Sequence, residues 1–352
     1  MSLIDKLVKN STLKDRVSSL DKSEFFGKSD YCPTDVPILN VALSGRLDGG
    51  LTAGLTVIAG KSKHFKSNYG LLMVSAFLKK YDDAVCLFYD SEYGCPPDYV
   101  KNFDIDLERV LHIPITNIEE LKFDIANQLD KIEKTDKVII FLDSLGNLAS
   151  KKEIDDAIDQ KAAVDMQRSK QIKSLFRIIT PILAVKNIPM VCINHTYDEM
   201  SLYAKQVVSG GSGVMYSADN VFIVGKAQEK DSDGLKGWTF TINIEKSRFI
   251  KEQSKLPITV YFGKGVYKYS GILELAVELG FCAKEGYSYI KTFKEDKDKL
   301  HLKNASDEQL DEWFKDILEN EDFKAKVFEK YTLGINSDKE LEINQTYQIT
   351  NL

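Results

Sequence analysis

The stretch Gly60-Lys61-Ser62-Lys63-His64-Phe65-Lys66-Ser67 follows the apolar run LTVIA and precedes a helical pattern. It matches the phosphate-loop pattern GxxxxGK[ST], except that Phe65 stands at the second glycine. A loop between a strand and a helix N-terminus directs successive backbone N–H groups and the helix dipole at one phosphate. The stretch therefore predicts an ATP site formed by the residues from Gly60 to Asn68, in which Lys66 reaches the β- and γ-phosphates and Ser67 ligates Mg²⁺.

Phe65 is the departure from this pattern. Glycine at the same place tolerates a strained backbone and the close approach of a phosphate, so a bulky side chain must point away or the loop must shift. The alternative is an ordinary strand-to-helix turn that happens to carry Lys-Ser. The strand pattern before the loop and the helical pattern after it favour the phosphate loop.

Polar residues also follow three other predicted strands. Asp143 closes the run KVIIFL and would hold the magnesium shell, because sheets of this kind bind ligands at the carboxyl ends of their strands. Glu92 follows AVCLFY, where a carboxylate can align and deprotonate a water beside the γ-phosphate. On spacing alone, Glu92 could equally be a solvated turn residue. His195 follows MVCIN and either senses the γ-phosphate or fills the strand end.

Short apolar runs alternate with helical patterns over the first two hundred residues. We predict strands at 55–59, 84–89, 110–113, 137–142 and 190–194, and helices at 66–80, 118–132 and about 162–186. Strand, crossover helix and strand in succession build a parallel sheet. The runs at 221–225, 238–246 and 258–262 follow one another without helices, which predicts an antiparallel extension of that sheet.

The two ends of the chain differ from this central part. Residues 1–30 begin with an amphipathic helical pattern, which is either a docking arm or a helix packed on its own domain. After a break near 283–303, the chain becomes charged and helical, with Ser306 as a candidate N-cap. We expect three parts: an arm over 1–30, a core over 31–290 and a small C-terminal lobe over 291–352.

Composition bounds the class of protein. The chain has 352 residues, is 43% hydrophobic and 28% charged, and carries a net charge of −6, so any polyanion must meet a local basic surface. Its start lacks the apolar core of a signal peptide, and no apolar run is long enough for a membrane span. The cysteines lie far apart, which suits a reducing cytoplasm, and the histidines show no metal-ligand spacing.

Taken together, these pieces resemble the RecA family of recombinases, most closely the UvsX recombinases of tailed bacteriophages. The likeness covers about residues 20–290. It is carried by VCLFYDSE, FLDSLGNLASKKE, INHTY, the GGSG at 210–213, MYSADNVFI and IEKSR. UvsX proteins also have phenylalanine before the loop lysine. The resemblance implies an α/β fold: a RecA-like P-loop ATPase core with a mainly parallel central sheet, an N-terminal helical arm and a small C-terminal α/β lobe.

The resemblance also implies roles for single residues. Glu92 matches the family's catalytic glutamate, and Tyr99 matches the aromatic residue that stacks on adenine. His195 stands where bacterial RecA has a glutamine that links the γ-phosphate to the second DNA-binding loop. Lys246 and Arg248 match two basic residues that reach across the filament interface to the neighbouring protomer's nucleotide. ATP would then hold subunits together.

DNA contacts can also be predicted from the residues themselves, independently of the family resemblance. Lys170, Lys173 and Arg177 fall at i, i+3 and i+7, which places them in one stripe of a helix that could follow a phosphate backbone. A solvated helix face explains such a stripe equally well. Its position favours DNA, because the stripe lies between segments 151–163 and 196–213, which resemble the family's two DNA-binding loops.

The second of these loops offers two kinds of contact. Gly210 and Gly211 would present backbone N–H groups to phosphates. Met200, Tyr203 or Val207 could insert between bases, and the sequence does not choose among them.

We therefore expect an ATP- and Mg²⁺-dependent recombinase that forms helical filaments on single-stranded DNA and pairs it with homologous duplex DNA. The family implies a phage single-strand-binding protein and a loading mediator as partners, in the cytoplasm of a bacterial host. Two alternatives remain open: a ring-forming helicase or motor of the same fold, and a non-catalytic protein clamped by nucleotide. A small-molecule kinase would need a lid and an acceptor pocket, which no segment suggests.

Overall fold

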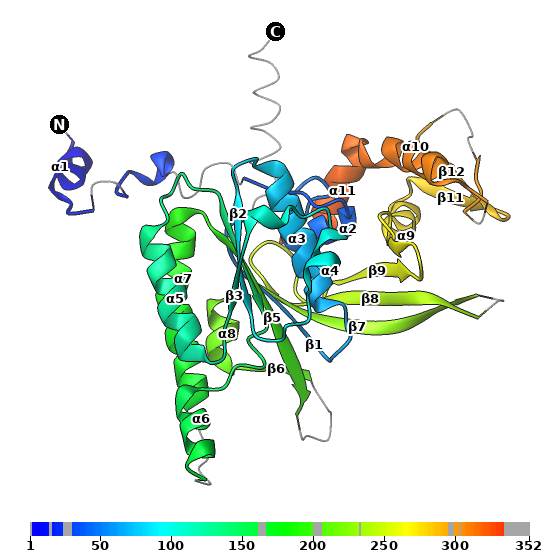
Figure 1. Cartoon of the computed structure of the whole chain (residues 1–352). Helices are drawn as coiled ribbons and strands as arrows, with labels where there is room; N and C mark the ends of the chain where they lie inside the picture. Colours follow the sequence, from blue (N-terminus) through cyan, green and yellow to red (C-terminus); the bar gives the residue numbers. More distant parts are fainter. Residues whose placement is uncertain are drawn as a thin grey trace. The chain divides into compact units, whose positions relative to one another are not determined.

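The computed structural model describes residues 2–13, 16–23, 30–160, 167–199, 206–231, 234–294, 299–302 and 304–333 (Figure 1). The chain forms two compact units, Met1–Tyr31 and Cys32–Leu352.

The first unit contains helix α1 (Leu3–Asn10) and a short 3-10 turn, η1 (Leu20–Lys22). Ser2 and Asp5 form a capping box at the start of α1, since each side chain accepts a hydrogen bond from the other residue's backbone N–H, at 3.1 and 2.8 Å. The amphipathic pattern thus produces the predicted helix. Leu3, Ile4 and Leu7 lie exposed on it.

The second unit is built on a ten-stranded sheet with the order β10-β9-β8-β7-β1-β5-β4-β2-β3, to which β6 is added through β5. The strands are β1 (Gly54–Gly60), β2 (Val85–Asp90), β3 (Val110–Pro114), β4 (Val138–Asp143), β5 (Pro189–Asp198), β6 (Gln206–Val208), β7 (Asn220–Asp231), β8 (Gly234–Ser247), β9 (Lys255–Tyr261) and β10 (Gly265–Val266). Neighbours from β7 through β1 to β3 pair in parallel, whereas β7 to β10 pair antiparallel. Both predictions, the parallel sheet and its antiparallel extension, are confirmed.

Helices cover both faces of the sheet (Figure 1). One apolar layer contains side chains of α2 (Pro37–Ser44) and α3 (Lys66–Lys80), beside the short α4 (Pro97–Lys101). The other contains side chains of α5 (Ile118–Lys131), α7 (Gln167–Lys186) and α8 (Ser212–Ser217). The layers alternate along the strands: Ile58 packs into the first and Val57 into the second. A sheet buried on both faces explains why its strands are continuous apolar runs.

Predicted boundaries differ from the structure beside both expected DNA loops. The segment expected as a loop over 151–163 begins with helix α6 (Lys151–Ile158), because the Ser150 hydroxyl accepts a hydrogen bond from the Glu153 backbone N–H and caps it. Strand β5 continues past Asn194 to Asp198, because its last residues pair with β6. The expected start of α7 near 162 lies outside the described residues.

The C-terminal part of the same unit adds a small antiparallel sheet and three helices. They are β11 (Cys282–Glu285), β12 (Ser288–Lys291), β13 (Lys299–Leu300), α9 (Ile272–Glu278), α10 (Asp307–Leu318) and α11 (Glu321–Tyr331). Ser306 caps α10, as its side chain predicted. Phe314 and Phe323 are fully buried and belong to the apolar cluster that also contains α2 and α3. None of the described helices has the length and apolar character needed to cross a bilayer.

Candidate nucleotide and DNA-binding site

Strand register brings the predicted site residues to one edge of the sheet. Gly60, the last residue of β1, pairs with His195 on β5, and Asp90 on β2 pairs with Asp143 on β4. These residues stand at or near the carboxyl ends of four adjacent parallel strands, where sheets of this kind bind ligands. The phosphate loop leaves β1 at the same edge and enters α3.

Phe65 shows how the loop accommodates its missing glycine. It has the left-handed conformation (φ 61°, ψ 15°) that the pattern usually assigns to glycine. Its ring points away from the loop, stacks on Phe240 with ring centres 5.0 Å apart, and meets Tyr69 edge-on at 5.4 Å. Of the two expected solutions, the structure has the first: the side chain turns into the apolar layer.

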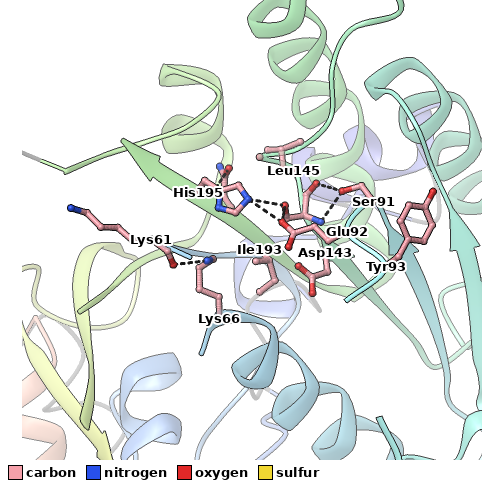
Figure 2. A network of polar contacts seen from close by, with 12 residues as sticks. Lys61, Lys66, Ser91, Glu92, Tyr93, Asp143, Leu145, Ile193 and His195 are labelled. Atoms are coloured by element: carbon pink, nitrogen blue, oxygen red, sulfur yellow. Dashed lines mark hydrogen bonds and ion pairs between the residues drawn. The ribbon is translucent and has the colours of Figure 1, made fainter. Parts of the chain in front are cut away.

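Lys66 is buried at the first position of α3, and burial lowers the pKa of its ammonium group. Its Nζ donates to the backbone carbonyl of Lys61 at 2.9 Å. Lys61, Ser62 and Lys63 are exposed, while His64 contacts the Ser62 carbonyl through Nδ1 at 3.0 Å. The loop therefore holds its lysine inward, toward the edge where Asp143 and Glu92 also lie (Figure 2).

Asp143 and Ser67 provide the oxygens expected of a magnesium site. Asp143 is 3% exposed, accepts a hydrogen bond from the Ser67 hydroxyl, and leaves its Oδ1 without a partner among the described residues. A buried carboxylate oxygen with no donor fits a hard cation. Burial, with smaller contributions from Glu92 and Asp90, raises the pKa of Asp143 to about 6, and the charge of a bound cation would oppose this shift. The described residues contain no cluster of three acidic, cysteine or histidine ligands.

Glu92 is held by two neighbours (Figure 2). Its Oε1 lies 3.0 Å from His195 Nε2 and accepts a hydrogen bond from the Ser144 hydroxyl. The bond from His195 is the main reason that the pKa of Glu92 lies below its usual value. An ionised carboxylate at this place can align a water and accept its proton as hydrolysis proceeds.

Gly146 and Ser144 lie against His195 and Glu92, and sequence reasoning missed both. A Cβ on Gly146 would lie 2.1 Å from His195 Cδ2, so only glycine leaves room for the imidazole ring. Ser144 also connects two strands, because its backbone N–H donates to the Ser91 hydroxyl at 3.0 Å and its carbonyl accepts from that hydroxyl at 2.7 Å. Both residues lie in the DSLG run directly after β4, and that position is the signal that could have found them.

A cavity of about 790 Å³ begins beside the phosphate loop and is lined by α3, α4 and the strands β9 and β10. Tyr99 and Asn68 line it, and the Asn68 side-chain amide donates to the Tyr99 hydroxyl at 2.6 Å. Phe65 and Val260 add apolar surface. An aromatic ring and apolar walls beside a phosphate loop suit a planar base.

Lys246 and Arg248 do not lie at this edge. Lys246 Nζ donates to the carbonyls of Met215 and Ala218, both at 2.7 Å, at the end of α8. Arg248 Nε forms an ion pair at 2.7 Å with Asp219, whose other oxygen accepts from the backbone N–H of Leu55. Both residues are thus at the amino end of β1, roughly 20 Å from the loop at its carboxyl end.

The predicted DNA stripe is on the surface of α7. Lys170, Lys173 and Arg177 are all exposed, whereas Ile172 and Leu175 between them are buried. The spacing therefore predicted the outward face of the helix correctly.

Arg168, two residues and about half a turn before Lys170, has the opposite orientation and was missed. Its guanidinium donates to the carbonyls of Leu145, Gly146 and Leu148, and to the Ser209 hydroxyl at 3.4 Å. It joins the chain that follows β4 to the chain that follows β6. It stands four residues before Ile172 and seven before Leu175, which places it on the buried face of the helix, and this spacing is the signal that could have found it.

The second expected DNA loop is described in part. Gly210 and Gly211 both have positive φ, at 93° and 72°. At Gly211 an added Cβ would meet no described atom within 4 Å, so its backbone is open. Val207 pairs with Tyr197 in the β5–β6 ladder. Met200 and Tyr203 lie outside the described residues.

Comparison with known proteins places these features in a family. Residues 14–267 match the RecA N-terminal domain family. Over 96% of this chain and 88% of the relative, the sequence is 45% identical to the "Recombination and repair protein" of Enterobacteria phage T4. It is 23% identical to the protein RecA of Aquifex aeolicus, over 68% of this chain and 70% of that one, and 23% identical to the protein RecA of Bartonella quintana, over 80% of each. The chain therefore belongs to the RecA family.

Proposed function

We propose that this protein is an ATP-dependent recombinase of the phage type, which forms helical filaments on single-stranded DNA and catalyses homologous pairing and strand exchange. The observation that carries the proposal is the cluster of Lys66, Asp143, Glu92 and His195 at one sheet edge. His195 lies on β5, the strand that leads into the second DNA loop. The strand exchange itself needs only positioning of DNA, because base pairing tests homology.

Each residue of the cluster has a stated role in this proposal. Lys66 binds the β- and γ-phosphates, and Glu92 orients the attacking water. Ser67 and Asp143 would hold Mg²⁺, which would supply positive charge to neutralise the phosphates. Tyr99 stacks on the base of ATP. His195 contacts Glu92 directly, so a change at the γ-phosphate would reach β5 through one hydrogen bond.

The finer partners follow from the same proposal. Lys170, Lys173 and Arg177 contact the DNA backbone together with Gly210 and Gly211, and Lys246 and Arg248 complete the ATP site of a neighbouring protomer. The arm over residues 1–30 docks on a neighbour in the filament, the core covers 31–290, and 291–352 form the lobe. A phage single-strand-binding protein and a mediator assist loading in the cytoplasm of the bacterial host, during recombination, repair and recombination-dependent replication.

Two variants test the roles at the phosphate loop. Lys66→Ala should abolish nucleotide-dependent filaments, because it removes the cation that holds the β- and γ-phosphates. Glu92→Gln should keep assembly and slow DNA-stimulated hydrolysis by about 10²- to 10⁴-fold, the usual contribution of a positioned base. Phosphate release with and without single-stranded DNA measures both. Hydrolysis by Glu92→Gln at the normal rate would refute the role of Glu92.

Assembly and strand exchange are tested on the unmodified chain. With single-stranded DNA and an ATP analogue, electron microscopy should show helical filaments, and a homologous duplex should exchange a strand where a heterologous one does not. Closed rings would instead indicate a helicase or motor, and the absence of DNA-stimulated hydrolysis would indicate a nucleotide clamp.

A further inference from the structure

An ion pair links the phosphate loop to the base of the second DNA loop. Lys61 Nζ lies 3.0 Å from Asp198 Oδ2, and the two side chains are 49% and 53% exposed. The residues are far apart in sequence, and the pair is separate from the contact between His195 and Glu92. In Figure 2 the Lys61 side chain extends away from Lys66, Glu92 and His195.

The backbone of Lys61 has a second contact, with the catalytic lysine. Lys66 Nζ donates to the Lys61 carbonyl at 2.9 Å. Lys61 therefore has one partner at its backbone carbonyl and another at its side-chain ammonium. A triphosphate whose oxygens take up the Lys66 ammonium competes directly with this carbonyl. Lys61 is thus the residue of the loop whose backbone partner changes when phosphates bind to Lys66.

Asp198 occupies a position that can transmit such a change. It is the last residue of β5, and it pairs with Gln206, the first residue of β6. This pair of residues belongs to the segment 196–213, which is expected to contact DNA. A force on Asp198 therefore acts on the stem of that loop.

We propose that Asp198 is a positioning residue that, through its ion pair with Lys61, makes the grip of the second loop on single-stranded DNA depend on the nucleotide. The route runs from phosphate to Lys66, to the Lys61 carbonyl, and from the Lys61 ammonium to Asp198. It acts beside the contact between His195 and Glu92 and does not use it. The inference rests on the proposed function, since it requires DNA binding that responds to ATP.

The expected size of the effect is small. Exposed ion pairs contribute little to free energy, so the pair can change the response to nucleotide by about two- to fivefold and no more. Most of the response must come from elsewhere in the site. Salt would screen the contribution, because both side chains are half exposed.

The measured quantity is the ratio of the dissociation constant for single-stranded DNA without nucleotide to that with a saturating, non-hydrolysable ATP analogue. Asp198→Asn should lower this ratio by about two- to fivefold. Using a ratio removes the general gain in DNA affinity that follows from deleting a negative charge. Asp198→Glu keeps the charge and should preserve the ratio. Glu199→Gln, which deletes the same charge at the next exposed residue, should also preserve it.

A double-mutant cycle with Lys61→Met completes the test. If the pair transmits the signal, Lys61→Met should lower the ratio, and the double variant should be no worse than the poorer single variant. The proposal is overturned if Asp198→Asn keeps the normal ratio, if Asp198→Glu or Glu199→Gln lowers it as much, or if the two single effects multiply. A ratio of one in the unmodified protein would instead refute the proposed function. Unfolding in urea confirms that each variant is folded.

Discussion

Phe65 combines an unfavourable backbone conformation with favourable packing of its ring. The free energies of these two effects decide which one dominates. A left-handed residue with a side chain costs about 1–2 kcal/mol, and glycine avoids this cost. Removing a fully buried phenylalanine ring costs about 3–5 kcal/mol, and Phe65 is half-buried, so its ring contributes roughly half of that. The ring's contacts with Phe240 and Tyr69 therefore outweigh the strain by a small margin.

Replacing Phe65 tests this balance. Phe65→Gly should lower the free energy of unfolding by about 1 kcal/mol, since it loses the ring but relieves the backbone. Phe65→Ala loses the ring and keeps the strain, so it should be about 1 kcal/mol less stable than Phe65→Gly. Urea unfolding of the full chain measures both. Equal stability of the two variants would show that the left-handed conformation costs nothing here.

Gly146 controls the position of the imidazole that holds Glu92. In Gly146→Ala the new methyl group would overlap the His195 ring, so the ring must move and its contact with Glu92 must lengthen. Displacement of a catalytic group by about 1 Å can cost 10²-fold in rate, so we expect DNA-stimulated ATP hydrolysis to fall by about 10- to 100-fold while nucleotide binding is kept.

Gly225→Ala is the matched control for this substitution, because a Cβ at Gly225 meets its nearest atom at 3.6 Å, an ordinary contact. Hydrolysis and binding of a fluorescent ATP analogue should both stay normal in that variant. If Gly146→Ala also hydrolyses ATP normally, the position of His195 does not limit the reaction.

At the scale of elements, the sequence predicted the strands, which depend on apolar periodicity, and the site residues that follow strand ends. The apolar runs located the strands of the parallel sheet because both of its faces are buried, and strand ends located Asp143, Glu92 and His195. Side-chain direction after an element ends depends on tertiary contacts, which no local pattern contains. For this reason the partners of Lys61 and Ser144 could not be foreseen. Arg168 lies within α7 and shares the face of Ile172, so helical spacing could have separated it from its exposed neighbours. Helix α6 was missed because the family likeness indicated a loop and Ser150 was not recognised as a cap.

The basic stripe of α7 yields a prediction for the whole helix. If Lys170, Lys173 and Arg177 each neutralise one phosphate, Lys173→Ala should reduce the slope of log affinity for single-stranded DNA against log salt concentration by about 0.7. Affinity should fall by similar factors for different DNA sequences, because phosphate contacts do not read bases. Lys131→Ala removes an exposed lysine at the end of α5 and serves as the control. An unchanged slope for Lys173→Ala would indicate a solvated face.

At the scale of the whole molecule, the positions of Lys246 and Arg248 bear on how ATP could connect protomers. They lie at the amino end of β1, while the phosphate loop leaves its carboxyl end. A lysine side chain cannot cover the roughly 20 Å between them. If these residues contact ATP, the nucleotide must belong to another protomer, and Lys246 must leave the carbonyls of Met215 and Ala218 to reach it.

Mixing two inactive variants tests this arrangement directly. Glu92→Gln assembles but lacks its own hydrolytic carboxylate, and Lys246→Ala lacks the cation offered to a neighbour, so each alone should hydrolyse ATP poorly. In an equal mixture that assembles at random, about a quarter of the interfaces join an intact Glu92 to an intact Lys246, and about a quarter of the normal rate should return. A mixture of Glu92→Gln with the double variant Glu92→Gln/Lys246→Ala contains no intact Glu92 and should stay inactive. Failure of the first mixture to recover, with filaments still forming, would place the whole ATP site within one chain.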